Sequence, residues 1–138
     1  MAGARLCCLL RPSILFILLL LSIGTTLGSD LKSCPDRCEC NGFTINCAAR
    51  GLDSIPRNLS PAVQRLDLQE NRISIIRKSD LAGLRNLKVL QLSDNQIHAI
   101  EESSFKDLHR LERLRMNRNH LRILPDRLFA FAPELYRL

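Results

Sequence analysis

Four closely spaced cysteines are the residues of this chain with the clearest capacity for chemistry. Cys34, Cys38, Cys40 and Cys47 follow the pattern Cys-x3-Cys-x-Cys-x6-Cys. Four thiols this close either bind zinc or form two disulfides, and the outcome depends on the redox compartment. The ligands of zinc sites usually come as two well-separated pairs, whereas these four cysteines form one cluster. The spacing therefore favours two disulfides, for which three pairings are open.

The amino-terminal segment predicts an oxidising compartment. Arg5 and Arg11 precede a largely apolar run, Ile14–Ile23, which is followed by small residues ending at Gly28. This order is that of a secretory signal peptide, which we assign to residues 1–28. A membrane span needs about twenty apolar residues, so the run is too short to be an anchor. We expect a secreted, extracellular product without a membrane span. Cleavage removes the first two cysteines and leaves an even number.

A repeat of 24 residues organises the rest of the chain. Asn71, Asn95 and Asn119 are each 24 apart, and the same shift superposes apolar residues. These fall in columns: Val63, Leu87, Leu111, Leu135; Leu66, Leu90, Leu114, Leu138; Leu68, Leu92, Met116; Ile73, Ile97, Leu121; Ile76, Ile100, Leu124; and Leu81, Phe105, Phe129. The pattern L-x-x-L-x-L-x-x-N-x-L is that of leucine-rich repeats. It predicts repeats at residues 62–85, 86–109 and 110–133, with a fourth beginning at 134–138.

The repeat predicts an α/β-type solenoid, a leucine-rich repeat horseshoe segment. Leu66 and Leu68 alternate with outward residues as in a short strand, and their copies form parallel strands on a concave face. The convex side is expected to be irregular or 3-10, with Phe105, Phe129 and Leu81 stacked as a partial spine. An asparagine amide both donates and accepts hydrogen bonds. The asparagine column is therefore predicted to form a ladder between the turns of neighbouring coils.

The cysteine segment is predicted to be a disulfide-bonded cap, residues 29–61. A solenoid needs its first core edge covered. A shift of 21 residues places Ile45–Cys47 over Leu66–Leu68, and Leu52 and Ile55 over Ile73 and Ile76. The cap is thus a degenerate repeat with a strand at Phe43–Cys47.

The outward positions of the predicted strands are the candidate binding face. They form three columns and a rim: Arg65, Val89, Arg113 and Arg137; Asp67, Gln91 and Arg115; Gln69, Ser93 and Asn117; and Glu70, Asp94 and Arg118 at the rim. Concave solenoid surfaces usually bind partners. The plainer alternative is that these side chains are only solvated.

The excess positive charge of the chain is concentrated in its last fifth. The whole chain has 20 Lys and Arg against 14 Asp and Glu, and residues 110–138 contain seven arginines against three acidic residues. Arg113, Arg115, Arg118 and Arg137 therefore predict an acidic partner. Outside the cell this favours a sulfated glycosaminoglycan such as heparan sulfate over nucleic acid.

The sequence predicts no enzyme, metal site or cofactor. His98, His109 and His120 are spaced by eleven residues, but the 24-residue repeat places them on different sides of the coil. The Ser, Asp and His residues form no nucleophile motif, and the cysteines are assigned to disulfides. Asn58-Leu-Ser60 is a glycosylation sequon, followed directly by Pro61.

Longer stretches of the chain resemble the first leucine-rich domain of the slit family, secreted axon-guidance ligands of roundabout receptors. The resemblance covers residues 34–138 and rests on Cys34-Pro-Asp-Arg-Cys-Glu-Cys, Arg65-Leu-Asp-Leu, Leu81-Ala-Gly-Leu-Arg-Asn-Leu-Lys-Val-Leu-Gln-Leu, Leu111-Glu-Arg-Leu-Arg-Met-Asn-Arg-Asn-His-Leu and Leu135-Tyr-Arg-Leu. It implies pairing of Cys34 with Cys40 and of Cys38 with Cys47. It also implies an extracellular protein partner in axon guidance or cell migration.

The chain departs from the slit pattern. Slit proteins continue through further leucine-rich domains and EGF-like modules, and roundabout binding is attributed to the second leucine-rich domain, which this sequence does not contain. We therefore expect a truncated product, with an exposed core edge that makes it prone to aggregate. The alternatives are a matrix protein resembling the small leucine-rich proteoglycans and a fragment of a receptor ectodomain. The coding sequence beyond codon 138 discriminates between them.

Overall fold

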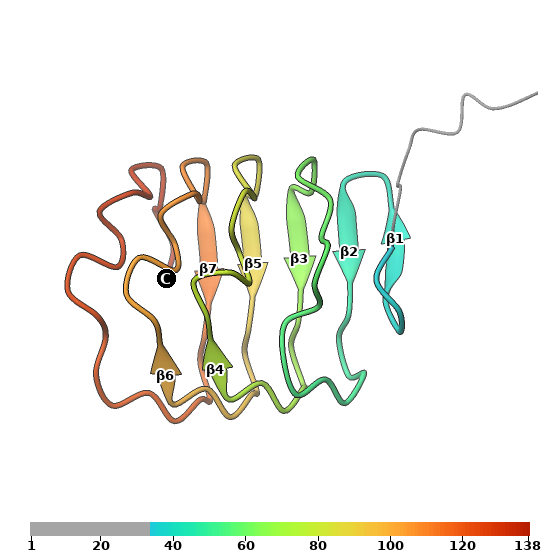
Figure 1. Ribbon diagram of the computed structural model, residues 1–138, viewed down its shortest axis with the longest axis horizontal. Coiled ribbons are helices and arrows are strands. Elements are labelled where there is room, and N and C mark those ends of the chain that lie inside the picture. Colours follow the sequence, from blue (N-terminus) through green and yellow to red (C-terminus); the bar gives the residue numbers. More distant parts are fainter. Residues whose placement is uncertain (1–33) are drawn as a thin grey trace, which may run out of the picture. The chain divides into compact units, whose positions relative to one another are not determined.

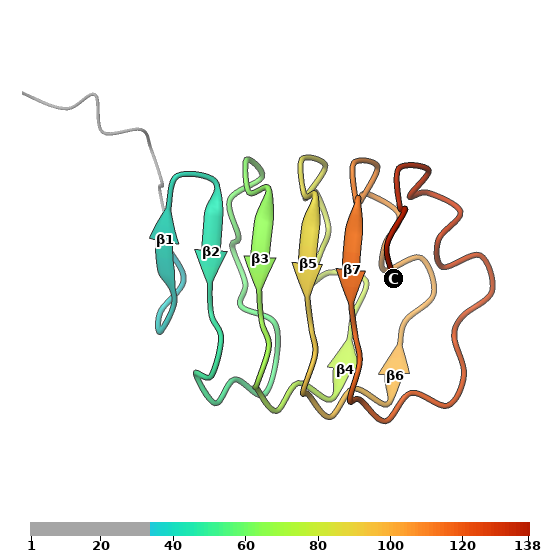
Figure 2. The same cartoon turned by 180° about the vertical axis from the view of Figure 1, so that it is seen from behind.

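The structure, a computed structural model, describes residues 34–138. The predicted signal peptide and the first residues of the cap lie outside this range. Within it the chain winds as a series of stacked coils, and each coil contributes one short strand to a common sheet (Figure 1). The same row of strands is seen from behind in Figure 2.

The main sheet has five strands in the order β1-β2-β3-β5-β7. Only the first pair is antiparallel, and every later pair is parallel. The strands are β1 (Glu39–Asn41), β2 (Thr44–Asn46), β3 (Arg65–Asp67), β5 (Val89–Gln91) and β7 (Arg113–Arg115). Thr44 pairs with Arg65, Arg65 with Val89 and Val89 with Arg113. The register therefore reproduces the sequence shifts of 21 and 24 residues, and a bridge from Arg113 to Arg137 continues it.

The opposite side of the coils carries a second, smaller parallel sheet. It pairs β4 (Ile75–Ile76) with β6 (Ala99–Ile100). Elsewhere the convex side is irregular, the first of the two forms predicted for it, and the described residues contain no α- or 3-10 helix. The predicted solenoid with short parallel strands on one side is confirmed. Residues 34–138 accordingly contain no helix able to cross a membrane.

A proline removes one of the bonds that would continue the convex sheet beyond two strands. The Glu101 N–H donates to the Ile76 carbonyl at 2.9 Å, which ties the second repeat to the first. The equivalent residue one repeat later is Pro125. Proline has no backbone N–H, so the third repeat cannot make this bond to Ile100.

The predicted apolar columns form one core between the two sides. Leu66, Leu90 and Leu114 are fully buried, as are Leu81 and Phe105. The ring centroids of Phe105 and Phe129 lie 6.2 Å apart, tilted by 53°, so the predicted spine is present. Burial decreases toward the last coil, where the core-column residues are partly buried or exposed: Met116, Leu121, Leu124, Leu135 and Leu138.

The asparagine column connects each coil to the one before it. Asn95 Nδ2 donates to the carbonyl of Leu68 at 2.9 Å, and its Oδ1 accepts the N–H of Ile73 at 3.0 Å. Asn119 repeats both bonds one coil later, to Leu92 and Ile97. Asn71 makes the same kind of contacts with the cap. Each amide also donates to carbonyls of its own turn.

A column of left-handed residues stands directly before the asparagines. Glu70, Asp94 and Arg118 have φ of 55–56°, and Ala49 of the cap has φ 54°. This conformation costs a non-glycine residue about 1–2 kcal/mol. In this conformation the backbone N–H points toward the next coil. The N–H of Glu70 donates to the carbonyl of Ser93 at 3.1 Å, and the N–H of Asp94 donates to the carbonyl of Asn117 at 3.0 Å. The conformational free energy that these turns cost is therefore offset by backbone hydrogen bonds between coils.

Two disulfides hold the cap together. Cys34 bonds to Cys40 and Cys38 to Cys47, the pairing that the slit resemblance implies. Cys47 is fully buried in the core beside Ile45. The second disulfide therefore joins the cap directly to the core, whereas Cys34 is exposed.

The asparagine ladder predicts a stability loss for Asn95→Leu. Leucine would leave the buried N–H of Ile73 without an acceptor and would remove one of the two amide hydrogen bonds to the Leu68 carbonyl, so the free energy of unfolding should fall by about 1–3 kcal/mol. Urea denaturation measures the loss. Gln96→Ala, at the exposed neighbouring position, is the matched control and should change stability little. Equal unfolding midpoints for parent and Asn95→Leu would show that the ladder does not stabilise the fold.

The two disulfides are predicted to differ in importance. Replacing Cys38 and Cys47 by alanine should cost about 2–5 kcal/mol, because it also leaves a cavity where Cys47 fills the core. Replacing Cys34 and Cys40 by alanine should cost less, since that bond closes a shorter and more exposed loop. Melting temperatures of the two double variants test the order, and the reverse order would contradict it.

Candidate functional site, the concave face of the main sheet

The outward columns of the main sheet form one continuous concave face. Arg65, Val89 and Arg113 are direct neighbours in register, as are Asp67, Gln91 and Arg115. The side chains that β5 and the residues directly after it place on this face are the most enclosed. Gln91 and Ser93 are buried and Val89 is half-buried.

Polar side chains on this face bond across neighbouring coils. Gln91 Nε2 donates to Asp67 Oδ2 at 2.9 Å, and Ser93 Oγ donates to Asn117 Oδ1 at 2.7 Å. The backbone N–H of Gln69 donates to the other oxygen of Asp67 at 3.2 Å. Both carboxylate oxygens of Asp67, the one acidic residue in the strand columns, are therefore occupied.

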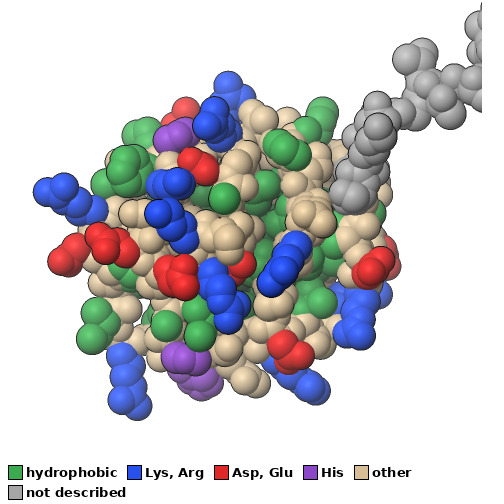
Figure 3. Space-filling view, viewed as in Figure 1, with side chains coloured by type: hydrophobic (Ala, Val, Ile, Leu, Met, Phe, Trp, Pro, Cys, Tyr) green, Lys and Arg blue, Asp and Glu red, His purple; other side chains and the backbone are tan. Residues whose placement is uncertain are grey.

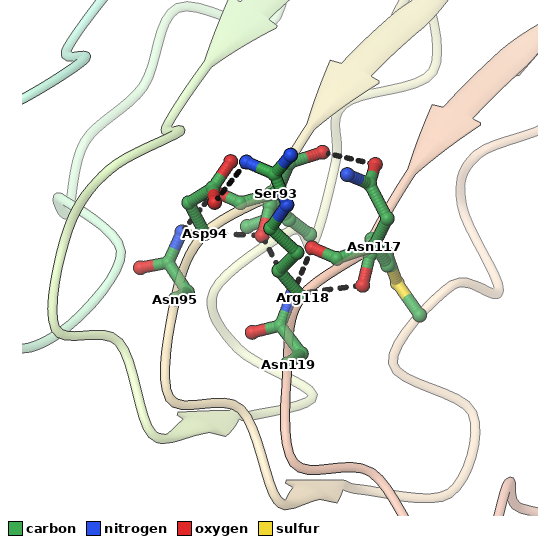
Figure 4. Close-up of polar contacts among 8 residues, drawn as sticks. Ser93, Asp94, Asn95, Asn117, Arg118 and Asn119 are labelled. Carbon is green, nitrogen blue, oxygen red and sulfur yellow. Dashed lines mark hydrogen bonds and ion pairs between the residues drawn. The ribbon is translucent and has the colours of Figure 1, made fainter.

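At the rim, Arg118 is held by an acidic residue of the preceding coil. Its Nη1 donates to Asp94 Oδ1 at 3.0 Å, an ion pair visible in Figure 4 beside Asn95 and Asn119. The hydrogen bond to Asp94 raises the pKa of Arg118 above its ordinary value. The sequence grouped Arg118 with the arginines available to an acidic partner. In the structure its charge is already paired.

Arg113 is fixed differently, by an aromatic ring. Its Nε donates to the hydroxyl oxygen of Tyr136 at 3.0 Å, and its guanidinium carbon lies 6.0 Å from the centroid of that ring. The hydrogen bond from Arg113 to the phenol raises the pKa of the guanidinium. The side chain is thus positioned by the next coil while remaining fully charged.

The other arginines of the face project into solvent. Arg65, Arg115 and Arg137 are exposed, and their guanidiniums make no hydrogen bond or ion pair with any residue between 34 and 138. The nearby Glu112 pairs with Lys88 at 3.4 Å. The positive charge predicted for this end of the face is present, and Arg118 does not contribute to it.

The remaining candidate residues lie away from this face. His98, His109 and His120 are exposed, and among the described residues no three His, Cys, Asp or Glu side chains gather as metal ligands. Asn58 of the sequon is exposed, with φ 60°. It lines an open groove of about 550 Å³ together with Leu59 and Asp80.

The opposite face has a different charge pattern. In the view of Figure 3, on the side of β4 and β6, positive and negative side chains are interspersed.

Sequence reasoning missed three features of the site. The left-handed turns at Glu70, Asp94 and Arg118 carry no glycine that would have indicated them. The Arg118–Asp94 pair joins residues 24 apart, which the repeat brings together, so the period itself was a usable signal. The contact of Arg113 with Tyr136 depends on side-chain rotamers and has no sequence signal.

The fold and the face define a leucine-rich repeat domain with a disulfide-bonded cap. The model of the leucine-rich repeat family matches residues 57–97 and 85–138, so the chain belongs to this family. Such domains mediate protein–protein binding. The disulfides fit an oxidising, extracellular compartment.

Several known proteins are similar to this chain. Human decorin is 42% identical over 57 residues, which is 41% of this chain and 16% of decorin. A peroxidasin homolog of Caenorhabditis briggsae is 44% identical over 71 residues, 50% of this chain and 5% of that protein. The chain therefore spans only a small part of these relatives.

Solved structures show the same fold. Human 5T4, the trophoblast glycoprotein, superposes with a TM-score of 0.61 at 28% identity, covering 67% of this chain and 35% of that one. The mouse RP105/MD-1 complex gives 0.63 at 29% identity, covering 69% and 16%.

Proposed function

We propose that this protein is a secreted, extracellular binding module of the slit type. It acts through protein–protein contacts of its concave face in axon guidance or cell migration. The observation that carries the proposal is the face itself: five strands on a fully buried core present columns of polar side chains in fixed register. A rigid, preorganised surface loses little entropy on binding.

The proposal is one of binding rather than catalysis. The buried polar groups of the face, Gln91 and Ser93, are hydrogen-bonded to neighbouring side chains. The charged groups of its strand columns are arginines, which do not release protons at accessible pH, and the carboxylate of Asp67, whose two oxygens both accept hydrogen bonds. This arrangement offers recognition contacts and no general base.

A matrix role resembling that of the small leucine-rich proteoglycans is the second candidate. The 42% identity to decorin over 57 residues favours it. The likeness to 5T4 is the corresponding support for a receptor ectodomain. All three candidates use the same face, so its involvement in binding is the first point to test.

A glycan placed on the concave face is predicted to block binding. Arg115→Asn together with Asn117→Thr creates a sequon on the face. The readout is staining of live embryonic neurons by the tagged, secreted full chain, with cells expressing a roundabout-type receptor as a second target. The bulky glycan should abolish the staining that the parent gives.

The matched control places a glycan on the other side. Gln96→Asn with His98→Thr creates a sequon at exposed positions outside the strand columns, and it should preserve staining. Mass shifts on glycosidase treatment verify that both sites are occupied. Unchanged staining with the concave glycan would refute the proposed binding face.

Heparan sulfate is proposed as an additional partner because of the excess positive charge. Reversing Arg113, Arg115 and Arg118 to glutamate should lower the salt concentration at which the chain elutes from a heparin column, because opposing charges attract less as screening increases. Reversal of the convex-side residues Arg77, Lys78 and Arg85 is the charge-matched control. Identical elution of the concave triple variant and the parent would exclude a glycan site on this face.

A further inference from the structure

We propose that Arg65, Arg113, Arg115 and Arg137 form a carboxylate-binding subsite that receives an extended acidic segment of a protein partner. The inference rests on the proposed function in one respect, since it takes the concave face as the binding face. The inference specifies which guanidiniums bind the partner and that they select carboxylates. Arg118, which is paired with Asp94, is not part of this subsite.

The first support is that no acidic side chain of residues 34–138 forms an ion pair with these arginines. Both oxygens of Asp67 accept hydrogen bonds, from Gln91 and from the Gln69 N–H. Asp94 is paired with Arg118, and Glu112 with Lys88. Glu70 at the rim is exposed and pairs with none of the four arginines, so their guanidiniums remain available to a carboxylate of a partner.

The second support is the fixed position of Arg113. Tyr136 engages only its Nε, so the two terminal nitrogens have no partner among residues 34–138. A guanidinium binds a carboxylate through two parallel N–H groups. Holding it in place beforehand reduces the entropy that binding must remove. Tyr136 thus acts as a positioning residue.

The third support is the spacing of the column. Arg65, Val89, Arg113 and Arg137 lie on successive parallel strands in one register. Neighbouring strands are about 4.8 Å apart, so the backbones of Arg65 and Arg113 are separated by roughly 10 Å. A peptide in the extended polyproline II conformation has three residues per turn and rises about 3.1 Å per residue, so residues three apart lie on one side, about 9 Å from each other. Acidic residues three apart in such a segment, crossing the strands, therefore match the two arginines.

An apolar floor favours a peptide over a sulfated glycan. Half-buried Val89 stands between Arg65 and Arg113, and the exposed ring of Tyr136 lies beside Arg113. Aliphatic side chains between the acidic residues of a peptide would contact this floor and remove it from water. A sulfated sugar chain has little apolar surface to place there.

The test uses the secreted full chain and a fluorescent nine-residue peptide with glutamate at every third position and threonine and valine between. The control peptide has glutamine in place of each glutamate. Fluorescence anisotropy should show binding of the glutamate peptide at least tenfold tighter than that of the glutamine peptide. A labelled heparin dodecasaccharide is measured in parallel.

Variants then locate the binding. Arg115→Gln and Arg65→Gln should each weaken the glutamate peptide about tenfold, the loss typical of one charge-assisted contact. Tyr136→Phe, which keeps the ring and removes the hydroxyl, should weaken it two- to threefold. Arg118→Gln, the matched control at a paired rim arginine, should leave affinity unchanged. All four positions are exposed, and melting temperatures verify folding.

Three results would overturn the subsite: equal affinity for the glutamate and glutamine peptides, an Arg118→Gln loss equal to that of Arg115→Gln, or binding of the dodecasaccharide without the peptide. None of these would affect the cell-staining test, which reports obstruction of the whole face. Blocked staining with no peptide binding would reject the subsite and retain the binding face. Retained staining with the concave glycan would reject the face itself.

Discussion

Every coil of this protein relies on its neighbour to complete its backbone hydrogen bonds. The main-chain groups at the end of each strand point along the stacking direction, where the asparagine amides and the left-handed turns connect them to the adjacent coil. A buried backbone group without a partner costs about 1–3 kcal/mol. Because this requirement recurs at each coil, the turns, the core residues and the surface residues all follow the same sequence repeat.

The same period arranges the chemistry of the concave face. Side chains 24 residues apart become neighbours, and this produces the contacts of Gln91 with Asp67, Ser93 with Asn117 and Arg118 with Asp94. Acidic residues that have a polar or basic neighbour in the preceding or following coil are satisfied internally. The unpaired arginines are those with no acidic residue directly before them in their columns. The distribution of paired and unpaired charge is therefore a consequence of stacking rather than of any local motif.

Much of the fold could be predicted from the sequence because stacking repeats the same apolar positions. The shifts of 21 and 24 residues reappear as the strand register, and Cys47 occupies the core position expected of a strand leucine. The sequence could not show features that depend on geometry without a residue signature. The left-handed turns use glutamate, aspartate and arginine rather than glycine. The candidate face was predicted as a set of positions, but the pairing of Arg118 and the anchoring of Arg113 require the side-chain arrangement. The resemblance to slit proteins stays a prediction of function.

Pro125 has a consequence for the curvature of the solenoid. A stack of coils bends only when its two sides have different spacings. Between the first and second repeats, β3 with β5 and β4 with β6 are both hydrogen-bonded parallel pairs, so the two sides share one spacing of about 4.8 Å and the stack is locally straight. Beyond Ile100 the convex side lacks this constraint and can widen while the main sheet keeps its register. The proline thus releases the convex side of the third repeat from the spacing that the first two repeats share, and the arginines of the last coils lie on the part of the stack that is free to bend.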